Sequence, residues 1–318
     1  MGKITKKICY SQKRTMESNR IKRTFAKNLL RISNMKFSPF YNILSAVICL
    51  LGSISCTSDT EEPFVNPENG PTGIPYHSLT IQELMPSDEI RVVLTQTFEC
   101  ANGQLSNYIG KQTYEAYNFE LINQSTIIYE DKQAIVTDAN QATSTYTLNS
   151  YGYATQCIRQ EAGGEERQYL FNYITDAGNR HYLKEIKEVL SNGQTYSQIV
   201  IERDNDYSIS AISQQIDTYK QQFQCINSKE IETVNTSQIP HPFLVEIHPL
   251  SMHLEALYGK LLGEPCPTMK QQILPEGTAE NVTYDFSSNT EGWFTSCQIT
   301  TSREGKKYIR KISYSFID

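Results

Sequence analysis

From about residue 90 to the C-terminus, apolar and polar side chains alternate in short runs that are separated by Gly, Asn and Asp. The clearest run is 308–316, in which Tyr308, Ile312, Tyr314 and Phe316 share one face and Arg310 is the exception on that face. Alternation with a period of two is typical of a half-buried β-strand. This run therefore predicts a strand with one apolar face.

A unit that resembles a hairpin recurs along the chain: two aromatic residues two positions apart, a turn, and a closing Ile. Copies lie at 146–158, 171–186 and 284–299, a shorter one lies at 98–105, and one at 199–212 lacks glycine. That last copy can still turn, because Asp204, Asn205 and Asp206 tolerate the positive φ that tight turns need. No helical pattern intervenes between residues 90 and 235. The pattern predicts an all-β fold, a large antiparallel meander of about fourteen to sixteen strands that is curled or barrel-like.

One segment departs from the alternation. Between Pro240 and Gly263, Leu and Met recur at helical spacing. The spacing predicts a short inserted helix at residues 251–262, with Ser251 as its N-cap and Gly263 beyond its C-terminus. An apolar helical stripe is usually core, so we expect a plug that covers the open end or face of the curled sheet.

The N-terminal region carries a targeting pattern. Lys36 precedes an apolar stretch at 41–51, and small residues lead to Cys56. The segment 35–55 resembles a bacterial lipoprotein signal peptide, in which the cysteine receives the lipid, although Ser53 stands where leucine is usual. The acidic run 57–62 is similar to the tag that sends Bacteroidota lipoproteins to the cell surface. We therefore expect lipidation at Cys56 and a lipid-anchored outer-membrane location at the cell surface; an ordinary signal peptide or an uncleaved anchor is the alternative.

Charge divides the chain further. Residues 1–34 hold ten basic residues and one acid, whereas residues 56–318 hold 18 Lys and Arg against 34 Asp and Glu, a net charge of −16. A body this acidic argues against nucleic acid as a partner. We interpret 1–34 as a non-native upstream extension, with a basic nucleic-acid-binding arm as the alternative. The segment 56–78, rich in Pro and Gly, is expected to be a flexible tether, and 79–318 a single β domain.

Together, the aromatic-x-aromatic units, the Asp/Asn-Gly turns with closing Ile, the Leu-rich segment Leu254–Gly263 and the lipoprotein leader resemble a known family. It is the Bacteroidota lipoprotein family of unknown function with a porin-like β fold. The resemblance covers roughly residues 90–318. It implies an antiparallel, curled or barrel-like sheet, and it brings no catalytic motif to these positions.

Candidate chemistry is sparse. His241, His248 and His253, with Glu246 and Glu255, could be drawn as a metal site, but the histidine spacings of seven and five do not place two ligands on one helical face. Sequence motifs of serine hydrolases, Walker-type nucleotide binders and dinucleotide binders are missing. Acid pairs occur at 88–89, 165–166 and 204–206, where a solvated face is the simpler interpretation. We predict no catalytic residue, no metal and no cofactor.

Besides Cys56, the body holds five cysteines, without a Cys-x-x-Cys pair. Most fall at strand positions, where a buried thiol behaves as a small hydrophobe. We expect mostly free buried thiols, although export would permit up to two disulfides. The five are Cys100, Cys157, Cys225, Cys266 and Cys297.

These patterns favour a non-catalytic envelope lipoprotein with a binding or structural role, attached to the membrane through Cys56. Outward tyrosines, with Trp293, could stack on a glycan or a peptide, and an envelope protein is a further possible partner. Two alternatives stay open. One is an integral outer-membrane β-barrel, and the other is a cryptic carbohydrate-active enzyme.

Overall fold

The computed structural model describes residues 73–85, 92–114, 118–227, 239–269 and 271–317. All of these residues belong to one compact unit of the chain. The predicted segments 1–34 and 35–55, Cys56 and most of the tether lie outside the described residues. Among the described residues, no helix is both long and apolar enough to span a bilayer.

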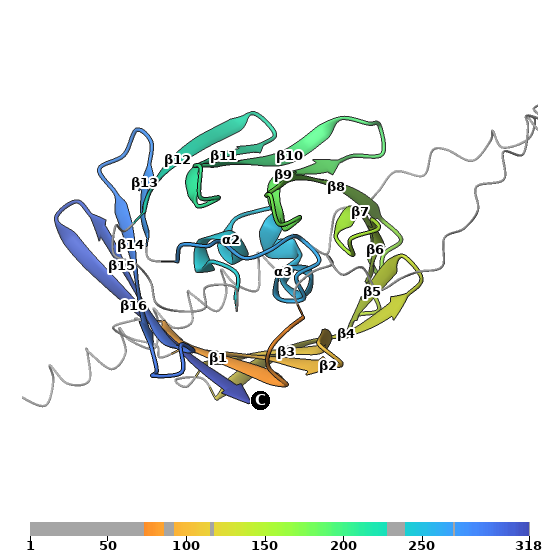
Figure 1. The fold of residues 1–318 in the computed structure, drawn as a ribbon, viewed down its shortest axis with the longest axis horizontal. Helices are drawn as coiled ribbons and strands as arrows, with labels where there is room; N and C mark the ends of the chain where they lie inside the picture. Colours follow the sequence, from red (N-terminus) through yellow and green to blue (C-terminus); the bar gives the residue numbers. More distant parts are fainter. Residues whose placement is uncertain (1–72, 86–91, 115–117, 228–238, 270, 318) are drawn as a thin grey trace, which may run out of the picture. The chain divides into compact units, whose positions relative to one another are not determined.

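Sixteen strands form a closed barrel in which each strand pairs antiparallel with its neighbours in sequence and β1 pairs with β16 (Figure 1). The prediction of a large antiparallel meander is confirmed, and the barrel is closed. The strands are β1 (Ser78–Met85), β2 (Val92–Ala101), β3 (Gln104–Tyr114), β4 (Phe119–Glu130), β5 (Gln133–Asp138), β6 (Thr143–Leu148), β7 (Ala154–Gln160), β8 (Glu166–Thr175), β9 (His181–Val189), β10 (Thr195–Arg203), β11 (Ile209–Ile216), β12 (Tyr219–Asn227), β13 (Gln271–Pro275), β14 (Asn281–Ser288), β15 (Phe294–Arg303) and β16 (Lys306–Ile317).

The hairpin turns use the Asn and Asp residues that the repeated unit contains. At Asn149, Asp176 and Asn289 the side-chain oxygen accepts hydrogen bonds from the backbone N–H groups two and four residues later. Such side chains stabilise a tight turn locally, which explains why the repeat is visible in the sequence. The turn without glycine also forms, but its positive φ of 67° falls on Tyr207 and not on an Asn or Asp.

The apolar face of each strand points into the barrel. On β16, Ile312 and Tyr314 are buried whereas Lys311 and Ser313 between and beside them are exposed. On β6, Ser144 and Tyr146 are buried, and the intervening threonines occupy the opposite face. The core of the protein is therefore the inside of the barrel.

The segment between β12 and β13 fills this interior. Figure 1 shows its short helices α2 (Pro242–Glu246) and α3 (Leu254–Tyr258) inside the ring of strands, with a turn of 3-10 helix, η3 (Leu250–Met252), between them. We call residues 239–269 the plug. The predicted covering segment is confirmed as a plug, and its position is inside the closed barrel.

The inserted helix is shorter than the sequence pattern predicted. Ser251 belongs to η3, and α3 begins after His253, whose φ of −128° and ψ of 39° are not helical. Gly259 ends α3, and Lys260 then takes a positive φ of 58°. The wall surrounds the segment and buries apolar side chains on several sides, so the apolar spacing did not require a continuous helix.

The end of the plug is hydrogen-bonded to the wall backbone. Ala154 N donates to Leu261 O, and Glu264 N donates to His181 O at 2.7 Å. Gly263 forms an isolated antiparallel bridge with Tyr182 and has a φ of +98°. A Cβ on Gly263 would lie 2.8 Å from His181 O, so only glycine allows this close approach.

Candidate functional site

Polar and charged side chains interrupt the apolar interior where the wall meets the plug. We call these interactions the wall–plug contacts. They come from strands that are far apart in the sequence, and they include charged, hydroxyl and amide groups of the wall that lie at or beside the plug. We describe them in turn, because they contain the charged groups that the apolar core does not explain.

Arg310 of β16 joins the wall to α2. Its Nε lies 2.6 Å from Glu83 Oε1 on β1, and its two terminal nitrogens bind both carboxylate oxygens of Glu246. Burial raises the pKa of Glu83, although the charge and hydrogen bond of Arg310 oppose this. For Arg310 itself, burial lowers the pKa, but Glu246 and Glu83 outweigh burial and the net pKa is raised. The guanidinium therefore bridges two carboxylates, one on the wall and one on the plug.

Glu188 of β9 is the most enclosed carboxylate among the wall–plug contacts, with only 2% of its side chain exposed. Its Oε1 accepts from Arg167 Nη1 at 3.2 Å. Its Oε2 accepts from Ser197 Oγ at 2.7 Å and lies 3.1 Å from His248 Nε2 of the plug. Burial raises the pKa of Glu188, but the hydrogen bonds of His248 and Ser197 outweigh burial and lower it overall. Glu188 is therefore held as an anion.

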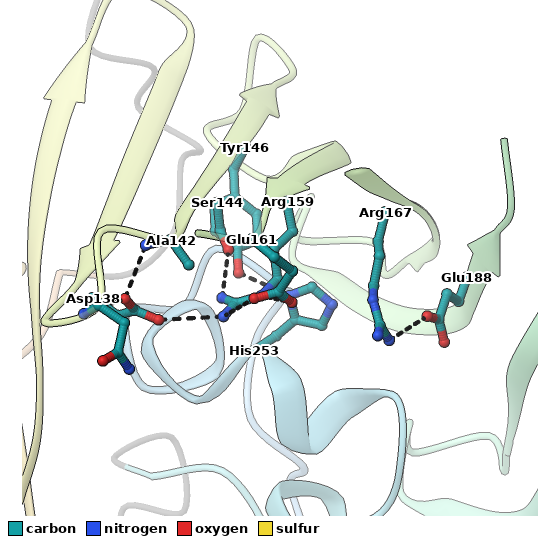
Figure 2. A network of polar contacts seen from close by, with 10 residues as sticks. Asp138, Ala142, Ser144, Tyr146, Arg159, Glu161, Arg167, Glu188 and His253 are labelled. Atoms are coloured by element: carbon teal, nitrogen blue, oxygen red, sulfur yellow. Dashed lines mark hydrogen bonds and ion pairs between the residues drawn. The ribbon is translucent and has the colours of Figure 1, made fainter. Parts of the chain in front are cut away.

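Figure 2 shows a third group, centred on Arg159 of β7. Arg159 Nε lies 2.8 Å from Glu161 Oε1, and its Nη2 lies 3.3 Å from Asp138 Oδ2 at the end of β5. Its Nη1 donates to Ser144 Oγ at 3.2 Å. Burial lowers the pKa of Arg159, but both carboxylates raise it above the usual value. These residues belong to the wall and lie beside His253 of the plug (Figure 2).

His253 is enclosed by aromatic rings. Its Nδ1 lies 2.8 Å from Tyr146 OH, and the rings of Tyr146, Tyr169 and Phe171 meet it edge-on at centroid distances of 5.8, 4.4 and 5.5 Å. Burial, with a smaller effect of Arg159, lowers the pKa of His253 to about 3. The ring is therefore neutral at physiological pH, and its Nε2 has no hydrogen-bond partner within the described part of the chain.

Further wall–plug contacts are hydrogen bonds. Ser125 Oγ donates to Glu255 Oε1 at 2.6 Å, and Tyr153 OH donates to Glu264 Oε1 at 3.0 Å. Gln214 Nε2 donates to the backbone oxygen of His248 at 2.7 Å. Ser125 lies on β4, Tyr153 lies directly before β7 and Gln214 lies on β11, so the plug is attached to separate parts of the wall.

The predicted candidate residues do not converge on one site. His241 caps α2 by accepting from Phe243 N, and its Nε2 lies 3.2 Å from Met269 O. His248 binds Glu188 and His253 binds Tyr146, so the three histidines have three separate partners. Among the described residues, no group of three His, Cys, Asp or Glu side chains lies close enough to hold a metal.

The remaining candidates are structural or lie elsewhere. Asp204 and Asp206 lie in the β10–β11 turn, where Asp206 accepts from Ser208 N. The acid pair at 88–89 lies outside the described residues. Trp293 packs against the rings of Tyr76 and Phe316, at 6.5 and 4.7 Å, and is not a free platform.

Cys100, Cys157, Cys225 and Cys297 are free, and all five body cysteines are buried. Burial raises the pKa of Cys100, Cys157 and Cys225 to about 12, and it raises the pKa of Cys297 further. These thiols are protonated at neutral pH, and the thiolate is the nucleophilic form. They are suited to packing and not to nucleophilic chemistry.

Sequence reasoning missed the charged residues of the wall that lie at or beside the plug. Arg159 lies two positions after Cys157, and Glu188 lies two positions after Ile186. Arg310 lies two positions before Ile312. Each charged residue therefore stands on the apolar face of its strand. A charge on the buried face is the signal that could have found them, and Arg310 was visible as an exception for this reason. Nothing in the sequence pattern connects them to the plug.

Comparison with known proteins gives the family and not a ligand. Residues 98–296 match the family described as a domain of unknown function (DUF4595) with porin-like fold. No curated protein matches the chain.

Several solved chains are similar to this one, and two of them are porin-like proteins from Bacteroides. The crystal structure of a porin-like protein from Bacteroides uniformis ATCC 8492 is 35% identical, with a TM-score of 0.73, over 78% of this chain and 100% of that chain. The crystal structure of a porin-like protein from Bacteroides vulgatus ATCC 8482 is 10% identical, with a TM-score of 0.43, over 76% of this chain and 98% of that chain. The second likeness is too slight for residues to be compared. The family match and the first structure together establish that this chain belongs to the family of domains of unknown function with a porin-like fold.

Proposed function

We propose that the chain is a non-catalytic envelope lipoprotein, anchored through Cys56, whose barrel stands in water and binds a glycan or a peptide. A porin-like fold suggests an association with the cell envelope. The lipid anchor rests on the sequence pattern that ends at Cys56. The observation that carries the proposal is the polarity of the outer wall of the barrel.

A barrel that crosses a bilayer needs an outward apolar band about 25 Å tall. The outward positions here alternate with the buried ones and are mostly uncharged polar residues. Examples are the threonines of β6 and the Ser, Gln and Thr side chains of β15. They are Thr143, Thr145, Thr147, Ser296, Gln298, Thr300 and Ser302. A membrane porin has apolar side chains on its outer face and polar side chains inside, whereas this barrel has polar side chains outside and apolar ones inside. The arrangement favours a water-exposed barrel over the integral outer-membrane alternative.

The interior supports a scaffold role. The charged groups of the lumen bind one another across the wall–plug contacts, as Glu188 does with Arg167 and His248. A glycosidase needs two carboxylates that face a substrate across a cleft. Glu83 and Glu246 instead share one guanidinium, so they fit a structural role better than the carbohydrate-active alternative.

Exposed aromatic side chains at one end of the barrel support ligand binding. Tyr196, Tyr219 and Tyr308 each begin a strand after a hairpin turn at that end, and each is more than a third exposed. Tyrosine offers a flat apolar face and a hydroxyl, which suits stacking on a sugar ring or a peptide. We expect the ligand to bind at this end.

Fractionation of the native organism's membranes tests the anchor. The wild-type chain should pellet with membranes, and the Cys56→Ala chain should be released in soluble form. A Cys56→Ala chain that still requires detergent would contradict the water-exposed barrel. Glycan-array screening of the soluble Cys56→Ala chain tests the binding, with a combined Tyr219→Ala and Tyr308→Ala variant as control. A glycan signal that this control retains would place binding elsewhere.

A further inference from the structure

One half of β4 has a free edge. β4 is 12 residues long, and its first eight residues pair with β3, from Phe119 opposite Tyr114 to Thr126 opposite Asn107. Its pairing with β5 covers only Ser125 to Glu130. Within the described part of the chain, no strand pairs with the other side of residues 119–123.

The backbone of this edge is arranged for pairing with another strand. Ala139 N donates to Gln124 O, so the backbone groups of Gln124 point to the β5 side of the strand. Because successive residues point to opposite sides, the N–H and C=O groups of Ile122 and Glu120 point to the same side, beyond the end of β5. These groups form a row of donors and acceptors at an open sheet edge.

The side chains of the edge are apolar and exposed. Phe119, Leu121 and Ile122 are 50, 48 and 64% exposed. Long apolar edges normally carry charges or prolines that prevent pairing between chains. Here the carboxylate of Glu120 already lies 2.8 Å from Lys111 Nζ, so its charge does not prevent another strand from pairing with the edge.

We propose that two copies of this chain pair antiparallel through β4, with Leu121 of one copy opposite Leu121 of the other. In this register Glu120 of each copy lies opposite Ile122 of the other copy. The free backbone N–H and C=O groups of both residues then find hydrogen-bond partners in the other copy. A two-fold contact of this kind is self-complementary, which favours a second copy over an unrelated peptide.

Charge complementarity supports the same register. In β3, Lys111 lies opposite Ile122. The pairing would place the second copy's Glu120 on the other side of Ile122, so each Ile122 lies between a Lys and a Glu. Glu120 does not meet itself, and Phe119 lies opposite Asn123. No like charges therefore face each other directly across the strand pair.

The test is sedimentation velocity of the full chain carrying Cys56→Ala, over a wide range of protein concentrations. The wild-type edge should give a reversible dimer. Ile122→Pro removes an N–H that points to the open edge and should abolish the dimer while the barrel remains folded. Ile122→Lys should do the same by adding a charge to the edge. Ile128→Lys is the matched control, because Ile128 is 57% exposed on the same strand but lies where β5 covers the edge.

Cysteine cross-linking checks the register. In the proposed pairing, the two Leu121 residues form a close pair whose Cα separation suits a disulfide. Leu121→Cys should therefore oxidise to a covalent dimer, and Ile128→Cys should not. A chain that stays monomeric at all concentrations would overturn the proposal. So would a dimer that survives both Ile122→Lys and Ile122→Pro, or a monomer that pairs only with an added extended peptide.

Discussion

Gly263 provides a sharp test of how the plug is attached to the wall. Its φ of +98° disfavours any residue with a side chain, and its backbone approaches β9. A Cβ at this position would lie 2.8 Å from His181 O and 3.0 Å from Leu183 N. Both are backbone atoms of β9, which is paired with β8 at His181 and Leu183, so neither can rotate away.

Gly263→Ala should therefore cost both backbone strain and a collision. The strain of a positive φ in a residue other than glycine is about 1–3 kcal/mol. The collision requires the plug to move away from β9, which loses the bond from Glu264 N to His181 O and adds about 1–3 kcal/mol. We expect the free energy of unfolding to fall by roughly 2–6 kcal/mol in total.

Gly277→Ala is the matched control. Gly277 also has a positive φ, of 74°, but a Cβ there would meet nothing within 4 Å. It should show the strain alone, about 1–3 kcal/mol, without the loss of a hydrogen bond. Urea denaturation followed by tyrosine fluorescence or circular dichroism measures both variants, provided that the slope against denaturant is unchanged. Equal losses in the two variants would refute the close contact between the plug and β9.

Three further outcomes follow from the lumen. The pKa of His253 is lowered to about 3 from an ordinary 6.5. The neutral buried ring therefore contributes its whole stabilisation above about pH 6.5, and the free energy of unfolding falls on acidification by up to about 1.4 kcal/mol per pH unit. His253→Gln should reduce that slope in denaturation measured from about pH 7 to about pH 4.5. Arg310→Met leaves the buried Glu83 without its cation and should destabilise the fold by about 2 kcal/mol. Adding Glu83→Gln should recover part of this loss in a double-mutant cycle. If the effects of the two substitutions simply add, the two residues do not stabilise the fold as a pair. A thiol reagent should react slowly with the five body cysteines in the native Cys56→Ala chain and fully after denaturation, and fast native reaction would contradict their burial.

Most of the strand pattern could be predicted because it depends on local rules. Period-two alternation identified strands such as β16, and the Asn and Asp residues at the turns specify hairpins through bonds to nearby backbone groups. A series of hairpins can only form an antiparallel meander. The inserted segment was also visible, because its leucines follow helical spacing and not strand spacing.

The plug shows where local pattern is insufficient. Helical spacing predicted one helix at 251–262, yet α3 covers only Leu254–Tyr258. A surrounding wall buries apolar side chains that point in many directions from the segment. Apolar periodicity therefore overestimates the length of a helix in such a segment. The positive φ of Tyr207 is a similar case, since Asn and Asp neighbours were the better local candidates.

The sequence by itself determined the strands, the turns, the buried face of each strand and the existence of an inserted apolar segment, because these depend on residues close together in the chain. Only the tertiary structure decided that the meander closes, that the insert enters the lumen, and which charges meet there. Arg310 and Glu246 are 64 positions apart and Ser125 and Glu255 are 130 apart, so their contacts depend on closure of the whole barrel. The open edge of β4 likewise became visible only when its neighbours were known, because the pairing of a strand is a property of the sheet.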